Sequence, residues 1–208
     1  MHAHLRSLAL GIVLAALAPL AQGAQIQTSA ALAGSNENPA VVTPGTGTAF
    51  VSLDTTTHQL RVTVTFSGLT TNDVAAHIHC CVAPPANVGV ATTVPAFPGF
   101  PLGVTSGGFD QTFDTSQAAI WNPAFIAAHG GTPLGAEAAL AAGLAIGQAY
   151  LNIHTTANPG GEIRGFLAPQ SVGPNNTGPI PTLSEWGLAL LAAILAAAAF
   201  LVLRRRMR

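Results

Sequence analysis

The sequence predicts an all-β domain, an antiparallel β-sandwich with one short helical crossover, placed between two apolar chain ends. Three observations carry this prediction. Apolar and polar residues alternate along residues 60–66, which is the period of a strand with one buried face. Several other strand-length segments follow, separated by turns rich in Gly, Pro, Asn and Asp. An uncharged apolar run lies near each end of the chain, at residues 8–20 and 186–203, which is typical of export segments and not of a folded core.

The elements can be assigned in chain order. Residues 48–53 are the expected hairpin partner of residues 60–66, and the polar residues 54–58 form the turn between them. The other predicted strands are residues 26–32, 74–79, 108–113, 148–155 and 162–167. Residues 82–103 are rich in Pro and Gly and are expected to form a long surface loop.

Only residues 118–143 have a helical pattern. Thr132 and Pro133 make a good cap and first turn, and Gly143 is a good stop signal. Strands with turn signals at this spacing favour an immunoglobulin-like, Greek-key arrangement in which the helical segment crosses between the two sheets.

The first residues predict a secretion signal. His2 and Arg6 give a mildly basic start, residues 8–20 are apolar, and Ala21-Gln22-Gly23 supplies small residues where a signal peptidase cuts. We therefore expect residues 1–23 to be a signal peptide, residues 25–169 to be the exported β-sandwich, and residues 170–179 to be a polar linker.

The last residues predict a transmembrane helix. Residues 186–203 carry no charge, and at ~1.5 Å per residue they span about 27 Å, close to the thickness of a bilayer core. Trp186 suits the headgroup level at one end. The basic residues 204–208 suit a cytoplasmic stop at the other end, and they include Arg204, Arg205, Arg206 and Arg208. A buried core helix is the alternative.

The octet before this helix resembles the C-terminal sorting signal called IPTL-CTERM, which is found on exported proteins of Gram-negative bacteria. The resemblance covers residues 180–208. It implies recognition by an exosortase-like membrane transpeptidase, with the protein anchored in the inner membrane and then moved to the cell surface or extracellular matrix. Whether the tail is cut or stays as a plain anchor is left open. The octet is Ile180, Pro181, Thr182, Leu183, Ser184, Glu185, Trp186 and Gly187.

The charge of the exported part excludes one class of partner. Between Gln25 and Pro179 there are seven carboxylates and two arginines, so the net charge is −5, and the chain has no lysine. A nucleic-acid-binding protein needs a cluster of basic side chains, which this composition does not provide.

Polar residues at period-two spacing mark a candidate site. His77 and His79 lie on one face of a strand, and His154 has the same outward position on a later strand. A hairpin between that strand and residues 162–167 brings His154 near Glu162, with Arg164 on the same face. These five residues share one outer surface if the first strand belongs to the same sheet.

The same segments resemble the chordin-type domain, CHRD. The matching motifs are residues 34–39 (Gly-Ser-Asn-Glu-Asn-Pro), residues 76–79 (Ala-His-Ile-His), residues 147–155, and residues 159–165 with Gly-Glu-Ile-Arg-Gly at the end. The resemblance covers nearly all of residues 32–167 and implies an all-β extracellular domain without catalytic activity. The Cys80-Cys81 pair and the Pro-rich loop after it depart from the family pattern.

Two interpretations of the histidine face are open. In the first, His77, His79 and His154 bind a metal ion, with Glu162 as a fourth ligand or an orienting group; imidazole ligands suit zinc or copper equally. In the second, the residues form a polar cluster in which Glu162 and Arg164 are ion-paired. An enzyme is not expected, because no nucleophile motif, paired carboxylates or phosphate-binding loop is present.

Cys80 and Cys81 are the only cysteines, in a compartment that oxidises thiols. A vicinal disulfide, two free thiols, links to another molecule, and small buried residues are all compatible with the sequence. We expect a binding or structural role for the protein, with matrix polysaccharide or other surface proteins as partners. A surface metal-binding protein is the alternative.

Overall fold

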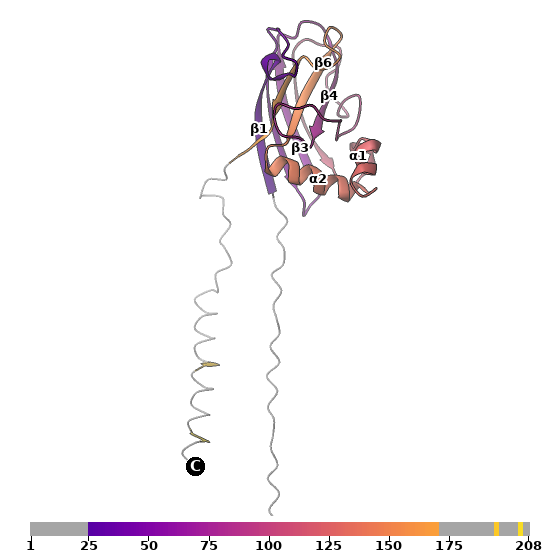
Figure 1. Ribbon diagram of the computed structural model, residues 1–208. Coiled ribbons are helices and arrows are strands. Elements are labelled where there is room, and N and C mark those ends of the chain that lie inside the picture. The colour runs from indigo at the N-terminus through magenta and orange to yellow at the C-terminus, as the bar shows by residue number, and fades with distance from the viewer. Residues whose placement is uncertain (1–24, 171–193, 196–203, 206–208) are drawn as a thin grey trace, which may run out of the picture. The chain divides into compact units, whose positions relative to one another are not determined.

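The computed structural model describes residues 25–170, 194–195 and 204–205 (Figure 1). The chain forms two units, residues 1–169 and 170–208, and residues 194–195 and 204–205 of the second unit are helical. The predicted signal peptide (1–23), nearly all of the linker (170–179), and most of the tail helix (186–203) lie outside the described residues. Across the residues that are described, none of the helices has both the length and the apolarity needed to span a bilayer.

One eight-stranded antiparallel sheet forms the body of the first unit. Every strand predicted from the sequence is found, with ends that shift by up to two residues. The strands are β1 (Gln25–Ala33), β2 (Thr46–Asp54), β3 (Gln59–Ser67), β4 (Asp73–Cys80), β5 (Gly107–Asp114), β6 (Ala149–Thr155), β7 (Ile163–Phe166) and β8 (Ala168–Pro169).

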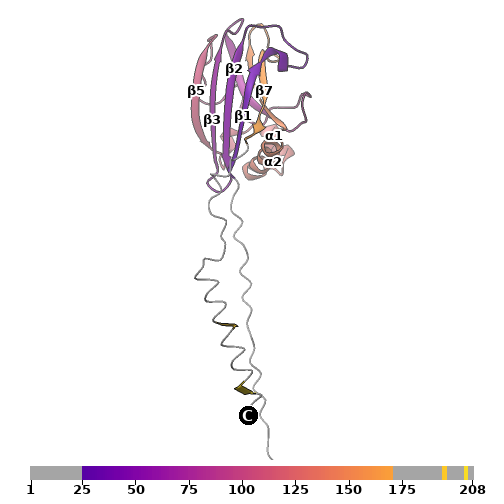
Figure 2. The ribbon, with the colours of Figure 1, turned by 90° about the vertical axis from the view of Figure 1, so that its left-hand side faces the viewer.

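The order of the strands corrects the predicted two-sheet sandwich. Along the sheet the order is β4-β6-β7-β1-β2-β3-β5, and Figure 2 shows β5, β3, β2, β1 and β7 side by side. Strand β1 pairs with β2 along its whole length and also with β7 through Ala33 and Arg164. Because β1 joins the two halves by backbone hydrogen bonds, the sheet is continuous and curls around one core, and the all-β prediction itself is confirmed.

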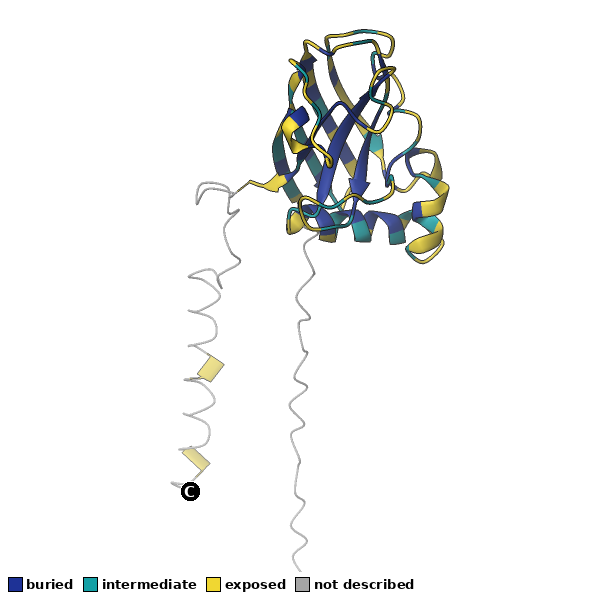
Figure 3. Ribbon diagram, turned by 45° about the horizontal axis from the view of Figure 1, so that its top comes forward, coloured by how far each residue is buried: buried dark blue, intermediate teal, exposed yellow. Residues whose placement is uncertain are grey.

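The predicted β2–β3 hairpin is confirmed, and its strands pair from Thr46 opposite Ser67 to Asp54 opposite Gln59. Its alternation puts Val51, Leu60 and Val62 in the core with no exposed surface, while their sequence neighbours face outward. Figure 3 shows buried residues along the strands and exposed residues on the loops and the outer side of the helices.

The predicted helical segment is broken into short pieces: η2 (Ala118–Ile120), α1 (Pro123–Ala128) and α2 (Pro133–Ala145). Gly130 and Gly131 have φ values of 86° and 71° between α1 and α2, a conformation that ends a helix at low cost for glycine. The predicted cap is confirmed, since the Gly135 amide donates to Thr132 Oγ1 at 3.1 Å. Helix α2 continues past Gly143 to Ala145. One further short turn, η1 (Gly34–Asn36), follows β1.

Residues 82–103 are not only a surface loop, as the sequence predicted. Ala91, Phe97 and Phe100 are at most 6% exposed. Phe100 stacks on Phe66 of β3 with ring centroids 5.7 Å apart, and Phe97 packs on Phe109 of β5 at 6.0 Å. The segment therefore contributes to the core inside the curled sheet, because its aromatic side chains bury large apolar surfaces there.

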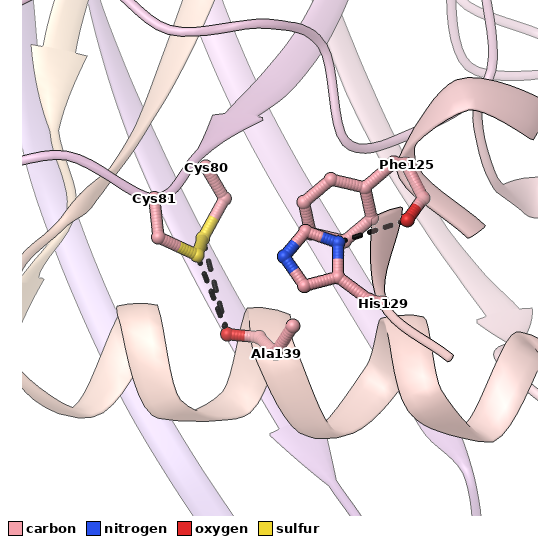
Figure 4. Close-up of a disulfide and its surroundings, with 5 residues drawn as sticks. All are labelled: Cys80, Cys81, Phe125, His129 and Ala139. Atoms are coloured by element: carbon pink, nitrogen blue, oxygen red, sulfur yellow. Dashed lines mark hydrogen bonds between the residues drawn. A yellow bond between two sulfur atoms is a disulfide. The ribbon is translucent and has the colours of Figure 1, made fainter. Parts of the chain in front are cut away.

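Cys80 and Cys81 form a vicinal disulfide at the end of β4. The disulfide lies over α2, where both Sγ atoms contact the Ala139 carbonyl oxygen (Figure 4). Gly143 is the α2 residue that makes room for it. A β-carbon at Gly143 would lie 2.4 Å from Cys80 Sγ and 2.8 Å from Cys81 Sγ, closer than van der Waals contact.

We therefore expect Gly143→Ala to destabilise the domain by about 1–3 kcal/mol, because overpacking outweighs the better helix propensity of alanine. Urea denaturation without reductant measures this effect. Gly108→Ala is the matched control, since a β-carbon there meets no atom within 4 Å. A Gly143→Ala protein as stable as the wild type would contradict the close packing of the helix on the disulfide.

Candidate metal centre

Pairing between β4 and β6 brings the three predicted histidines together. His77 lies opposite Asn152 and His79 lies opposite Tyr150, while His154 lies opposite Ala75. All of these residues point to one face of the two strands, because side chains alternate along each strand. The predicted site required the strand of His77 and His79 to lie in the same sheet as the strand of His154, and the pairing of β4 with β6 confirms this.

The three imidazole rings are in contact. The ring centroid of His77 lies 4.7 Å from that of His79 and 4.6 Å from that of His154. One nitrogen from each ring lies within 4.8 Å of the nitrogens of the other two. At metal–nitrogen distances of about 2.0–2.1 Å, two ligand atoms are at most about 4.2 Å apart. A small rotation of the rings is then sufficient to bind one ion between them.

Backbone carbonyls hold two of the rings. His79 Nδ1 lies 2.7 Å from the Val88 carbonyl oxygen, and His154 Nδ1 lies 3.0 Å from the Pro159 carbonyl oxygen. A carbonyl oxygen only accepts hydrogen bonds, so both Nδ1 atoms donate and each neutral ring keeps a lone pair on Nε2. This is the arrangement in which proteins orient histidine ligands towards a metal.

One buried nitrogen of each ring has no hydrogen-bond partner among the described residues. These nitrogens are the Nε2 atoms of His79 and His154 and the Nδ1 atom of His77. An unsatisfied buried polar atom costs about 1–3 kcal/mol. A metal ion bound to all three nitrogens would remove that cost at once, which a polar cluster without an ion does not do.

The environment keeps the rings neutral, as metal ligands must be. Burial, followed by the charges that His79 and His154 carry when protonated, lowers the pKa of His77 to about 3. Burial lowers the pKa of His79 to about 4, although its hydrogen bond to Val88 acts in the opposite direction. The pKa of His154 is also lowered by burial. Protons therefore do not compete for these nitrogens at neutral pH.

The site is covered, which differs from the open outer surface expected from the sequence. His77 is 6% exposed, and His79 and His154 are each 8% exposed. The carbonyls of Val88 and Pro159 come from the loops after β4 and β6, and these loops close over the face that alternation alone predicts to be outward. The rest of β6 is buried as well.

Glu162 is not part of the histidine cluster. Its carboxylate accepts hydrogen bonds from the hydroxyls of Thr43, Thr70 and Thr155, from the Thr70 backbone amide and from the side chain of Asn158, at 2.5 to 3.3 Å. Burial alone would raise the pKa of Glu162, but these hydrogen bonds together lower it. The residue is therefore an ionised anchor for three loops, because its threonine partners take all the acceptor positions that a metal would need.

The predicted ion pair between Glu162 and Arg164 is not formed. Arg164 is 1% exposed and its Nε lies 3.7 Å from a carboxylate oxygen of Glu37. The guanidinium also donates to the Asn36 and Pro85 carbonyls and to Asn87 Oδ1, at 2.5 to 2.9 Å. Arg164 therefore bonds to the segments that contain Asn36 and Pro85. Glu162, which precedes β7, bonds to the threonines instead.

The sequence did not single out Glu37 as part of the site. Its Oε1 atom and Oδ1 of Asn152 are buried without a partner among the described residues. Both atoms lie at Gly161, where a β-carbon would come within 2.7 Å of each. Glu37 lies in the first CHRD-like motif and Arg164 in the last. The presence of both residues in matched motifs was the one feature of the sequence from which their contact could have been predicted.

Glu37 gives the stability of the protein a pH dependence that Glu37→Gln should remove. Burial raises the pKa of Glu37 to about 7 from 4.5, against the lowering effects of Arg164 and Asn152. Because the pKa is higher in the folded state, this contribution to stability is complete below pH 4.5 and is lost as the pH rises through about 7. After allowance for solvent screening, we expect the free energy of unfolding of the wild type to fall by about 2 kcal/mol relative to that of Glu37→Gln as the pH rises through this range.

Urea denaturation of both proteins between about pH 4.5 and pH 8 tests this expectation. Asp54→Asn is a control with the opposite sign, because backbone hydrogen bonds from Thr57 and Thr56 lower the pKa of Asp54. Its contribution is present above the unfolded pKa of 3.8 and is lost only below it, so between about pH 4.5 and pH 8 the difference between the wild type and Asp54→Asn should stay constant. A difference between wild type and Glu37→Gln that is constant with pH would show that Glu37 is not perturbed.

Comparison with known proteins gives two matches. The family model described as CHRD domain matches residues 28–167, and the model described as IPTL-CTERM motif matches residues 179–206. No curated protein and no solved structure matches the chain. The first match contains all three histidines, Glu37 and the disulfide.

Proposed function

Because this chain belongs to the CHRD-domain family and ends in an IPTL-CTERM motif, it is an exported, surface-sorted protein, and we propose that its domain binds a transition-metal ion. The proposed ligands are His77, His79 and His154. The proposed ions are zinc and copper, both of which imidazole ligands suit. The role is binding and not catalysis, in agreement with the expectation from the sequence.

The observation that supports this proposal is the set of three buried, unpartnered nitrogens on touching rings. A cluster that serves only to stabilise the fold would be expected to satisfy its own hydrogen-bonding atoms. Two of the rings are instead held by carbonyls through Nδ1, which leaves the lone pair of each Nε2 atom without a partner among the described residues. Glu162, the fourth candidate from the sequence, is not among the proposed ligands.

Titration of the purified full-length chain in detergent with zinc and copper salts, followed by elemental analysis after gel filtration, tests the proposal. We expect one ion per chain. Protein that retains no ion under these conditions would overturn the metal function and leave the structural interpretation of the histidines. Chelators and affinity tags that contain histidine must be absent from the preparation.

The tail supports a second part of the proposal. We propose that an exosortase-type enzyme recognises residues 180–187 and processes the tail after export, since the matched motif implies an enzyme of this kind. Mass spectrometry of the surface-located protein tests this, because a mature protein that still ends at Arg208 would show that the tail is not cut. Binding of matrix polysaccharide or other surface proteins remains a prediction of the sequence.

A further inference from the structure

We infer that the three-histidine site takes copper in the monovalent state, in preference to divalent copper or divalent zinc. This inference rests on the metal-binding function proposed above and goes further, because it assigns the charge of the ion. It is carried by three features: the ligands are all neutral, a buried guanidinium lies one ring away, and the chain supplies three ligands and not four.

The ligand set carries no negative charge. His77, His79 and His154 are the histidine, cysteine and acidic residues that gather at the site within the described part of the chain. Glu162 is occupied by its threonine partners, and Cys80 and Cys81 are joined to each other, so that neither offers a thiolate. A divalent ion at this site would therefore keep its full charge of two in a buried environment.

A buried positive charge stacks against one of the ligands. Arg164 Cζ lies 4.7 Å from the ring centroid of Tyr150, and the Tyr150 ring stacks on the His79 ring with centroids 4.5 Å apart and planes 8° apart. The guanidinium is thus separated from the His79 ring by the stacked Tyr150 ring. Its repulsion of a bound ion doubles when the charge of the ion doubles.

Glu37 offsets this positive charge only in part. It is the carboxylate paired with Arg164, at 3.7 Å, and burial raises its pKa to about 7, so that its negative charge is incomplete at neutral pH. The cost of desolvating an ion also rises with the square of its charge, by about fourfold from a monovalent to a divalent ion. Both effects favour the ion with the lower charge.

Coordination number points in the same direction. Zinc in proteins is almost always four-coordinate, so at this site it would need a fourth ligand from solvent. Monovalent copper has a closed d shell and is stable with two or three nitrogen ligands. The three histidines are therefore a complete ligand set for monovalent copper and an incomplete one for zinc.

The reduction potential of bound copper tests the inference on the full-length chain. A site that prefers the monovalent ion raises the potential above that of the aqueous Cu(II)/Cu(I) couple, and we expect this result. We also expect Cu(I) to bind at least about 100-fold more tightly than Zn(II). Affinities can be measured by competition with bathocuproine disulfonate for Cu(I), using ascorbate to leave the disulfide intact, and with a chromogenic chelator for Zn(II).

Glu37→Gln provides an internal comparison. Removing the carboxylate leaves the charge of Arg164 without an offset, so we expect Zn(II) affinity to fall by about tenfold and Cu(I) affinity by less than about threefold. A potential below that of the aqueous couple, or Zn(II) binding as tight as Cu(I) binding, would overturn the monovalent assignment and leave the metal site standing. Failure of all these ions to bind would instead overturn the proposed function.

Discussion

His154→Ala is expected to weaken metal binding by about a thousandfold or more, since loss of a ligand should exceed the 10–100-fold effect of losing an outer-shell partner. The substitution removes one of three nitrogens and also the contact that holds the ring to the Pro159 carbonyl. Two histidines from one strand, His77 and His79, then remain. The measurement is the affinity of the purified full-length variant for copper and zinc, with the stability of the metal-free protein recorded in parallel.

His129→Ala is the matched control for this experiment. His129 also bonds to a backbone carbonyl, that of Phe125 at 2.8 Å, and its ring packs on Phe125 (Figure 4). It is not a member of the histidine cluster. We expect wild-type affinity from this variant. Equal loss of metal in both variants would mean that the ion binds nonspecifically to histidines. Wild-type affinity in His154→Ala would mean that His154 is not a ligand.

Glu162→Ala is expected to destabilise the metal-free domain by about 3–5 kcal/mol. The substitution leaves the Thr43, Thr70 and Thr155 hydroxyls, the Thr70 amide and the Asn158 side chain without their common acceptor, and Thr155 among them is fully buried. Urea denaturation measures the loss. Asp110→Ala is a suitable comparison, because that carboxylate is half-exposed and bonds to Arg61 and Thr63 on the outer face of the sheet. Removing such a surface pair should cost much less, because solvent screens the two charges.

Glu162→Gln separates the structural role of Glu162 from a role at the metal. Glutamine keeps the size of the side chain and one acceptor oxygen, so the variant should fold with a smaller loss of stability. It should also bind metal as the wild type does, because the Glu162 carboxylate lies outside the histidine cluster. Loss of metal from a folded Glu162→Gln protein would restore the interpretation of Glu162 as a ligand.

The strands of this domain could be predicted because their signal is local. The alternation along residues 60–66 and the turn at residues 54–58 determine the β2–β3 hairpin without reference to the rest of the chain. The single curled sheet could not be predicted, because it depends on the pairing of Ala33 with Arg164, which are far apart in sequence. The aromatic residues of 82–103 were missed for a similar reason, since Phe97 and Phe100 have no strand period around them.

The histidines of the site were found from their spacing, and the surrounding groups were not. Period-two spacing places His77 and His79 on one face, and the same pattern orients His154. The partner of Arg164 was predicted incorrectly as Glu162, and the structure has Glu37 in its place. Glu162 instead accepts hydrogen bonds from threonines of three segments. Whether Glu162 bonds to Arg164 or to the threonines depends on which segments the tertiary structure brings together, and a single sequence does not contain that information.

The short strand β8 places the two ends of the domain next to each other, since Thr28 at the start of β1 pairs with Pro169. A brief peptide joining residue 169 to residue 25 would therefore close the backbone into a ring without disturbing the sheet. Such a cyclised chain, or a permuted one opened at an exposed turn such as residues 55–57, would allow the domain to be studied apart from its two apolar extensions.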